Sequence, residues 1–313
     1  MGELTIRARK LLGKPVQEAI LEDVEGGLAE LATAGHRSPK LTAVLVGDDP
    51  ASAIYVRTKT RTCEGLGIDS ETIELPENVS TKDLIGYIDE LNTNKGVDGI
   101  LVQLPLPSGV DTEAVLDNID PRKDVDGLHP HNVGLLVQGR PRFVPATPGG
   151  IMQMLDRRGI EIEGANAVII GRSEIVGKPM ASLLMHRNAT VTVCHSRTRD
   201  LPAVCRSADI LVVAVGRDAM VTKDFVKSGA TVIDVGINRV AARARVEDIF
   251  GEYSDWEKFN QRGYIVVGDV HPEVEEIAGA LTPVPGGVGP LTIGMLMSNT
   301  LEAAARLRAT STG

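Results

Sequence analysis

The chain has 313 residues, which is enough for about two domains. Its 42% hydrophobic and 24% charged residues are typical of a globular protein with a packed core. The net charge of −9 disfavours a nucleic-acid-binding surface, because phosphate binding over a broad face needs an excess of lysine and arginine. A small anionic cofactor remains compatible with this charge, since it needs only local donors.

The three cysteines, Cys63, Cys194 and Cys205, form no metal-ligand spacing, and the six histidines show no ligand cluster either. We therefore expect no catalytic metal, and reduced, mostly buried thiols in a cytoplasmic protein. No apolar run reaches the length of a membrane span, and the N-terminus lacks the apolar core of a signal peptide.

Strand-like and helix-like segments alternate through the first half of the chain. Aromatic residues make up only 3%, so the core must be built from valine, isoleucine, leucine and alanine, as in parallel sheets buried on both faces. The alternation predicts βαβ units and a parallel sheet. In chain order the pattern predicts a strand at 41–47, a helix at 51–66 stopped by Gly67, a strand at 72–75, a helix at 81–91, a strand at 99–104, a helix at 112–119 and a polar loop at 120–131.

A stretch rich in proline and glycine at 145–150 is the best candidate for a domain hinge, with a plausible helix after it. Beyond it the pattern predicts strands at 167–170, 190–194, 210–216, 230–236 and 265–270, and helices at 178–187 and 291–307. Residues 240–262 are polar, contain the only tryptophan, and are interpreted as a surface insertion. The fold class is therefore α/β with two domains: an N-terminal domain with a mostly parallel sheet and a Rossmann-like nucleotide-binding domain. We place the divisions at 1–148, 149–282 and 283–313, the last segment returning to the first domain as a helix.

The strand at 167–170 ends at Gly171, and Gly177 opens the helix that follows. This order favours a phosphate at the helix N-terminus, where backbone N–H groups are unpaired. The spacing between the glycines differs from the dinucleotide fingerprint, so a plain strand-to-helix turn is the alternative.

About 20 residues further on, NAD-binding folds usually carry an acidic residue for the ribose. This chain has Ser196 and Arg197 there instead, and together with Arg172 they suit a ribose 2′-phosphate. The sequence therefore favours NADP over NAD. The alternative is that Arg197 and Arg199 are ordinary surface charges.

Three polar features of the first half point to chemistry. Tyr55 and Lys59 are spaced to share one face of a helix, and Gln103 ends an apolar strand, where ligands bind in open α/β sheets. Asp124 and Asp126 lie in a loop. Taken singly, each has an ordinary explanation as a core-edge tyrosine, a solvated lysine, a satisfied amide or an acidic turn.

Together these features resemble one family. Five segments occur in the order found in the bifunctional methylenetetrahydrofolate dehydrogenase/cyclohydrolases, at residues 55–59, 102–107, 123–127, 171–179 and 283–290 (YVRTK, VQLPLP, KDVDG, GRSEIVGKP and PVPGGVGP). The resemblance covers nearly the whole chain. Two departures lie away from these segments: Ala146 replaces a cysteine of many relatives, and the 240–262 segment is longer than usual.

The resemblance implies two successive reactions at one site between the domains. NADP⁺ takes a hydride from 5,10-methylenetetrahydrofolate, and water then opens the methenyl cation to 10-formyltetrahydrofolate. It implies that Asp126 binds the pterin edge, that Tyr55 offers a flat face to a ring, that Lys59 takes the proton of the attacking water, and that Gln103 holds Lys59 in place.

The resemblance also implies wider binding sets. The substrate set is Ser52, Tyr55, Lys59, Val102, Gln103, Leu104, Asp126, Pro285, Gly286, Gly287, Val288 and Gly289, and the NADP set is Gly171, Arg172, Ser173, Ile175, Gly177, Ser196, Arg197 and Ile237. A cytoplasmic homodimer is implied as well, with no nucleic-acid or membrane partner. A monofunctional NAD(P)-dependent dehydrogenase acting on the same folate and a catalytically silent folate- or nucleotide-binding paralogue are the alternatives.

Overall fold

The computed structural model describes residues 7–251 and 256–309, which divide into two compact units. We call Gln17–Ala146 with Ile293–Gly313 the N-terminal unit, and Met1–Val16 with Thr147–Thr292 the central unit. Helices α1 (Gly13–Thr33) and α11 (Gly289–Ala309) each contribute residues to both units. None of the helices in the described part of the chain combines the length and hydropathy needed to cross a membrane.

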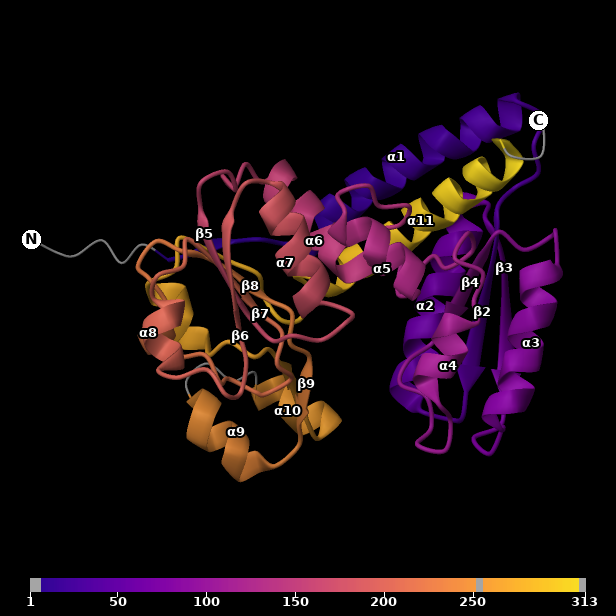
Figure 1. Cartoon of the computed structure of the whole chain (residues 1–313). Coiled ribbons are helices and arrows are strands. Elements are labelled where there is room, and N and C mark those ends of the chain that lie inside the picture. Colours follow the sequence, from indigo (N-terminus) through magenta and orange to yellow (C-terminus); the bar gives the residue numbers. More distant parts are fainter. Residues whose placement is uncertain (1–6, 252–255, 310–313) are drawn as a thin grey trace, which may run out of the picture. The chain divides into compact units, whose positions relative to one another are not determined.

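The N-terminal unit contains one parallel sheet in the order β3-β2-β4 (Figure 1). The chain passes from the central strand β2 to β3 on one side, and then crosses back to β4 on the other side. Open α/β sheets bind ligands at such a reversal, which here lies at the carboxyl ends of β2 and β4. The elements of this unit are β2 (Lys40–Val46), α2 (Pro50–Leu66), β3 (Asp69–Leu75), α3 (Thr81–Thr93), β4 (Gly99–Val102), α4 (Thr112–Asp117) and α5 (Pro130–Val137).

Both faces of this sheet are covered, because alternate residues of β2 point to opposite sides. Leu41, Ala43 and Leu45 pack with α1, α2 and α11, whereas Val44 and Val46 pack with α3 and α4. The predicted order of strands and helices from residue 41 to residue 117 is confirmed. Helix α5 was not predicted.

Helix α2 has clear local signals at both ends. The Asp49 side chain caps the first turn by accepting a hydrogen bond from Ser52 N at 2.8 Å, and Pro50 occupies the first helical position. Gly67 ends the helix in the left-handed conformation with φ of 73°. These signals place Ser52, Tyr55 and Lys59 in the first three turns of one helix.

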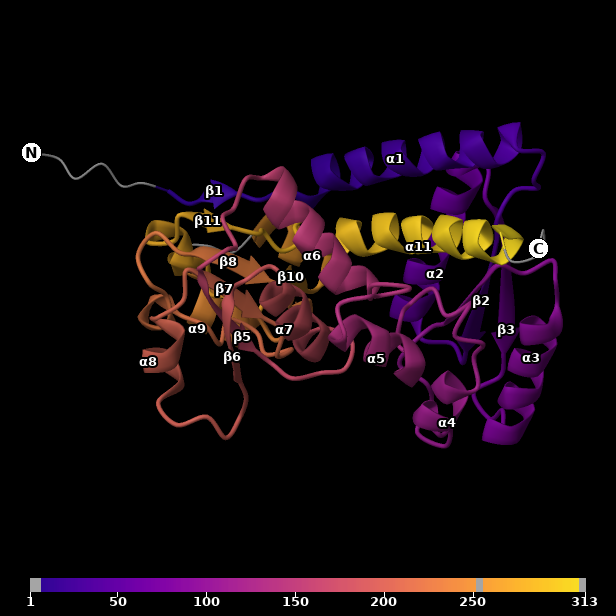
Figure 2. The same ribbon diagram turned by 45° about the horizontal axis from the view of Figure 1, so that its top comes forward.

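The central unit contains a six-stranded sheet in the order β6-β5-β7-β8-β11-β1, with every pair parallel (Figure 2). Helices α6 and α7 lie on one side and α8 on the other. The chain moves outward from β5 to β6 and then returns to β7 on the other side of β5, which is a second reversal of the kind where open α/β sheets bind ligands. The elements are β1 (Arg9–Lys10), α6 (Ala146–Arg157), β5 (Asn166–Ile170), α7 (Gly177–His186), β6 (Thr190–Cys194), α8 (Leu201–Cys205), β7 (Ile210–Val213), η1 (Lys223–Phe225), β8 (Thr231–Asp234), β9 (Asn238–Val240), α9 (Arg243–Phe250), α10 (Trp256–Arg262), β10 (Ile265–Val267), η3 (Pro272–Glu276) and β11 (Ala280–Leu281).

Two features of the central unit differ from expectation. The predicted hinge at 145–150 is helical from Ala146, although the boundary between the units does fall there. Proline is tolerated in a first helical turn, and Gly150 brings α6 against α11, since a Cβ there would lie 2.5 Å from Leu291 Cβ. Strand β1 pairs with β11, so the residues just before α1 join the central unit and not the first sheet.

The 240–262 segment is more than a surface insertion. Strands β9 and β10 pair antiparallel, and α9 and α10 enclose a small core of their own. Val246, Phe250 and Phe259 are buried in it, and Trp256 packs edge-on against Phe259. Ala241, Ala242 and Ala244 are exposed, so it is the larger apolar side chains in the described part of this segment that face inward.

Candidate functional site

Lys59 and Gln103, which are 44 positions apart, lie in direct contact. Lys59 is only 9% exposed, and its Nζ donates a hydrogen bond to Gln103 Oε1 at 3.0 Å. Gln103 follows β4 and extends the pairing with β2 through its backbone N, which donates to Val44 O at 2.9 Å. Its side-chain Nε2 donates to Leu104 O at 2.7 Å, so the amide oxygen is directed at the lysine.

Asp126 interacts with this pair electrostatically. The segment that carries it runs beside β4, since Ile100 N donates to Lys123 O at 2.8 Å. Burial lowers the pKa of Lys59, and the Asp126 carboxylate partly offsets that shift. Burial raises the pKa of Asp126 to about 6, opposed by Lys59 and increased by Asp124. The structure therefore places an amine, an amide and a carboxylate together at one end of the N-terminal sheet.

The two aspartates of this loop have different environments. Asp124 is buried, and its carboxylate accepts hydrogen bonds from Leu128 N, His129 N and Asn132 Nδ2 at 3.3, 2.9 and 2.8 Å. Asp126 is half-buried, and its carboxylate accepts no hydrogen bond from the described residues. Asp124 therefore holds the loop, whereas the Asp126 carboxylate is available to a ligand.

Asn299 supports the same loop and was not predicted. From helix α11 its Nδ2 donates to Val125 O at 2.8 Å and to Val144 O at 2.9 Å. The sequence signal is weak, because Asn299 stands between Ser298 and Thr300; only its burial in the structure shows that its amide needs partners.

The remaining predicted substrate residues of the N-terminal unit lie on or next to the same two elements, α2 and β4, as Lys59 and Gln103. Tyr55 is 41% exposed one helical turn before Lys59, and Ser52 is buried one turn earlier. Val102 is buried in β4 and Leu104 follows Gln103. Tyr55 is therefore not a core residue. Its exposed aromatic ring can stack against a flat ring of a ligand.

The turn from β5 to α7 is shaped by its two glycines. Gly171 has φ of 120°, and a Cβ there would lie 2.2 Å from Ala214 O; a Cβ on Gly177 would lie 2.3 Å from Gly171 O. Ser173 Oγ accepts hydrogen bonds from Val176 N and Gly177 N at 3.2 and 3.3 Å, which gives these two N–H groups at the start of α7 a partner. Backbone segments therefore pack closely around both glycines, at the helix N-terminus where a phosphate would bind.

Basic side chains flank this turn. Gly171 N donates to Cys194 O at 2.9 Å, so Ser196 and Arg197 follow the strand end next to Gly171. Arg172 and Arg197 are exposed, and their guanidinium groups form no ion pair with any described residue. Ile175 and Ile237 are exposed apolar side chains, at 47% and 55%. This combination fits NADP: free guanidinium groups for a phosphate and apolar surface for rings.

The predicted loop at Pro285–Gly289 packs against the start of α1. Gly13 N donates to Gly286 O at 2.9 Å, and a Cβ on Gly13 would lie 1.9 Å from Gly287 O. Gly286 has φ of 102°, a conformation that favours glycine. Val288 is buried, and Gly289 begins helix α11.

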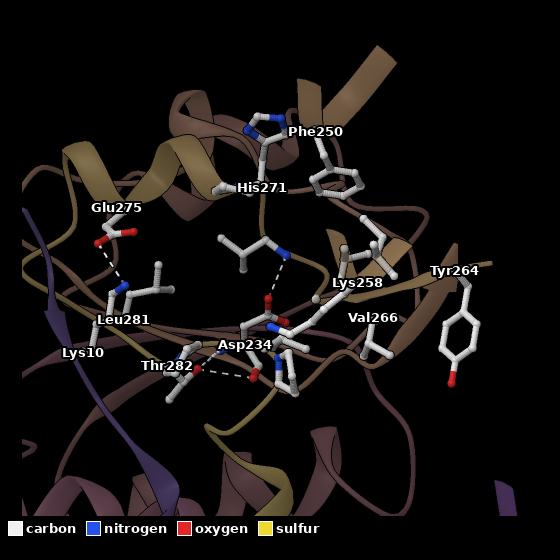
Figure 3. A pocket seen from close by; sticks show the side chains of 18 of the residues that line it. Lys10, Asp234, Phe250, Lys258, Tyr264, Val266, His271, Glu275, Leu281 and Thr282 are labelled. Carbon is white, nitrogen blue, oxygen red and sulfur yellow. Dashed lines mark hydrogen bonds and ion pairs between the residues drawn. The ribbon is translucent and has the colours of Figure 1, made fainter. Parts of the chain in front are cut away.

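A cavity of about 600 Å³ lies beside this loop in the central unit (Figure 3). It is lined by strand β10, by residues after β11 that include Pro285, and by Asp234. Two of its polar side chains are bonded within the protein: Lys10 pairs with Glu275 at 3.5 Å, and His271 Nε2 donates to Ile249 O at 2.7 Å. We assign no ligand to this cavity. The described residues also contain no group of three or more histidine, cysteine or acidic side chains that could hold a metal ion.

Comparison with known proteins matches most of the chain to two family models. Residues 11–126 match the catalytic domain of tetrahydrofolate dehydrogenase/cyclohydrolase, and residues 145–308 match the NAD(P)-binding domain of the same family. The chain is 55% identical over 293 residues to the bifunctional protein FolD of Koribacter versatilis, across 93% of this chain and 95% of that protein. It is 53% identical over 300 residues to the protein of the same name from Solibacter usitatus, across 95% and 98%.

Solved structures agree with these matches. The bifunctional FolD enzyme of Campylobacter jejuni superposes with a TM-score of 0.86 at 41% identity, across 96% of this chain and 99% of that one. The methylenetetrahydrofolate dehydrogenase-cyclohydrolase of Trypanosoma brucei, solved with NADP cofactor and an inhibitor, gives 0.86 at 38% identity with the same coverage.

Proposed function

Because this chain belongs to the tetrahydrofolate dehydrogenase/cyclohydrolase family, we propose that it catalyses two consecutive steps of one-carbon folate interconversion. It oxidises 5,10-methylenetetrahydrofolate to the methenyl cation with NADP⁺, and it hydrolyses that cation to 10-formyltetrahydrofolate. The observation that carries the assignment of roles is the 3.0 Å contact between the buried Lys59 amine and Gln103.

In the hydrolytic step Lys59 acts as the general base. Burial lowers its pKa, so a larger share of the side chain is a neutral amine that can accept the proton of the attacking water. Gln103 is too weak an acid or base to transfer protons itself. Its amide oxygen accepts a hydrogen bond from Lys59 Nζ and so directs the nitrogen lone pair away from the strand.

In both steps Asp126 and Tyr55 hold the folate. The Asp126 carboxylate has its acceptor sites available and can receive paired N–H bonds from the amino-amide edge of a pterin, which is a strong charge-assisted contact. The exposed Tyr55 ring offers a flat apolar face to a second ring. Ser52, Val102, Leu104 and the 285–289 loop complete the proposed substrate set.

The Gly171 turn, with Ser173, Ile175 and Gly177, holds NADP in this proposal. When bound, NADP⁺ is the acceptor of the hydride. Arg172, Ser196 and Arg197 bind the ribose 2′-phosphate, and Ile237 contacts a ring of the cofactor. We propose the corresponding division of labour along the chain: folate binding and catalysis by 1–148, NADP binding by 149–282, and a substrate loop and returning helix in 283–313.

Turnover of methylenetetrahydrofolate with each nicotinamide cofactor, followed by absorbance, tests this function. Hydrolysis of the methenyl compound is measured separately without cofactor. A monofunctional dehydrogenase would show only the first activity, and a silent binding paralogue would show neither.

We also propose that the protein is a cytoplasmic homodimer. The three free, buried cysteines support the cytoplasmic location, and the family resemblance supports the homodimer. Light scattering measures the oligomeric state.

Arg172→Ala should weaken NADP⁺ binding much more than NAD⁺ binding. Loss of one charge-assisted bond to the 2′-phosphate predicts a KM for NADP⁺ raised by about tenfold or more, whereas NAD⁺ has no such phosphate. Initial rates with both cofactors measure the change. Arg199→Ala, a nearby exposed arginine, is the matched control. Unchanged discrimination between the cofactors in Arg172→Ala would contradict the assignment.

The pH profile of the hydrolytic step should report Lys59. Because burial lowers its pKa, the fraction of neutral amine rises with pH with a midpoint below the ordinary lysine value of about 10.4. The rate, corrected for uncatalysed hydrolysis, should therefore rise with pH and have its midpoint below that value. A midpoint at or above the ordinary lysine pKa would mean that another group is the base.

A further inference from the structure

Asp269 is a buried carboxylate with four hydrogen-bond donors converging on it. It is 0% exposed and follows strand β10. Its Oδ2 accepts from Val215 N at 2.7 Å and Gly216 N at 2.9 Å, and its Oδ1 accepts from Arg217 N and the Asn238 side-chain amide, both at 2.8 Å. Three successive backbone N–H groups and one side chain therefore depend on a single residue.

A second buried carboxylate holds Asp269 itself in place. Asp234, at the end of β8, is labelled in Figure 3 among the residues that line the cavity. It accepts hydrogen bonds from Gly236 N at 3.0 Å, from Asp269 N at 2.9 Å and from Val270 N at 3.0 Å. Gly268 and Gly236 leave room for this arrangement, since a Cβ on Gly268 would lie 1.7 Å from Asp234 Oδ2 and one on Gly236 would lie 2.3 Å from Asp269 Cγ. The two aspartates therefore connect the ends of β7 and β8 to the segment after β10.

The backbone that Asp269 holds abuts the Gly171 turn. Ala214 N donates to Ile170 O at 2.9 Å, and Ala214 O is the atom that a Cβ on Gly171 would meet. Residues 215–217 continue directly from Ala214, beyond the carboxyl end of β7, the strand that pairs with β5. Asn238, the fourth donor, follows the exposed Ile237 at the end of β8. Asp269 thus holds two segments at the carboxyl edge of the sheet by hydrogen bonds: residues 215–217 and Asn238.

We propose that Asp269 is a positioning residue for the cofactor: by holding the 215–217 backbone and Asn238, it keeps the NADP site in its binding geometry before NADP arrives. This inference rests on the proposed function, in which NADP binds at the Gly171 turn. The physical reason is that buried N–H groups need acceptors, and a carboxylate satisfies four of them where an amide cannot. Without the carboxylate, at least one of these N–H groups must turn towards water, and the loop leaves its place beside Gly171.

The test compares Asp269→Asn with wild type in both activities. The substitution keeps the side-chain volume but points an NH₂ group at backbone donors. We expect the KM and the Kd for NADP⁺ to rise by about tenfold or more, with methenyl hydrolysis in the absence of cofactor unchanged. Asp218→Asn is the matched control, because Asp218 lies in the same loop but pairs with Arg245 at the surface at 3.1 Å.

Two outcomes would overturn the inference: an unchanged KM for NADP⁺ in folded Asp269→Asn, or an equal loss of both activities, which would mark a merely structural residue. If Asp269→Asn does not fold, the second variant is Asn238→Ala, which removes one donor and leaves the carboxylate in place. This variant should still raise the KM for NADP⁺. An unchanged KM for NADP⁺ in Asn238→Ala would reject the proposal. Absence of NADP⁺-dependent oxidation in the wild type would instead refute the proposed function, so the two failures are distinguishable.

Discussion

Lys59→Met should reduce methenyl hydrolysis by about 10²–10⁴-fold while leaving NADP⁺-dependent oxidation largely intact, because a general base contributes on that scale. Hydride transfer generates a cation and needs no proton transfer from the protein, whereas attack by water does. Methionine has nearly the length of lysine and no charge, so the buried site keeps its packing. Both activities are measured on the same purified variant.

The comparison is best made at about pH 8, where a carboxyl of pKa about 6 is ionised. Lys59 lowers the pKa of Asp126, so its removal raises that pKa and would protonate part of the carboxyl at lower pH. Lys82→Met, which changes an exposed lysine on α3, is the matched control. An equal loss of both activities in a folded Lys59→Met protein would refute a separate role for this amine.

Asp126→Asn should raise the KM for folate by about ten- to a hundredfold in both reactions, since it replaces charge-assisted hydrogen bonds with neutral ones. Unlike Asp124, whose carboxylate accepts three bonds within its loop, Asp126 has its acceptor sites available, so the loop should keep its fold. Steady-state kinetics with varied folate, together with NADP⁺ binding to the free protein, measure the effect.

The expected signature of Asp126→Asn is specific to the folate. NADP⁺ affinity should stay at the wild-type value, and Asp117→Asn, at an exposed aspartate on α4, should change nothing. If only one of the two activities loses folate affinity, or if both keep it, Asp126 does not bind the shared part of the substrate.

Predictions from the sequence were most accurate where the signal is local. Mostly apolar runs of four to seven residues marked β2, β4, β5, β7 and β8, the alternating threonines and valines at 190–194 marked β6, and Gly67 marked the end of α2. Predictions were weaker where a few residues are ordered by distant partners. Strands β1 and β11 have two residues each and exist because they pair with each other and with β8. No periodicity can be read from two residues.

The 240–262 segment and the start of α6 illustrate the same limit. Composition indicated a polar insertion and a flexible hinge, yet Phe250 and Phe259 form a small core and Gly150 serves close packing against Leu291. Glycine and proline have several structural uses, and only their neighbours in space show which one applies.

The sequence alone determined the α/β class, the order of most elements, the residue types needed for folate chemistry and the preference for NADP. These follow from hydrophobic periodicity, turn residues and motif order, all of which are properties of neighbouring positions in the chain. The family resemblance had already implied that Gln103 holds Lys59, and the structure shows that contact. Only the tertiary structure decided that Asp124 holds the loop while Asp126 remains available, and that Asp269 accepts hydrogen bonds from four donors. Such contacts depend on which strands lie side by side, because hydrogen bonds between distant residues form only after the order of the sheet brings their ends together.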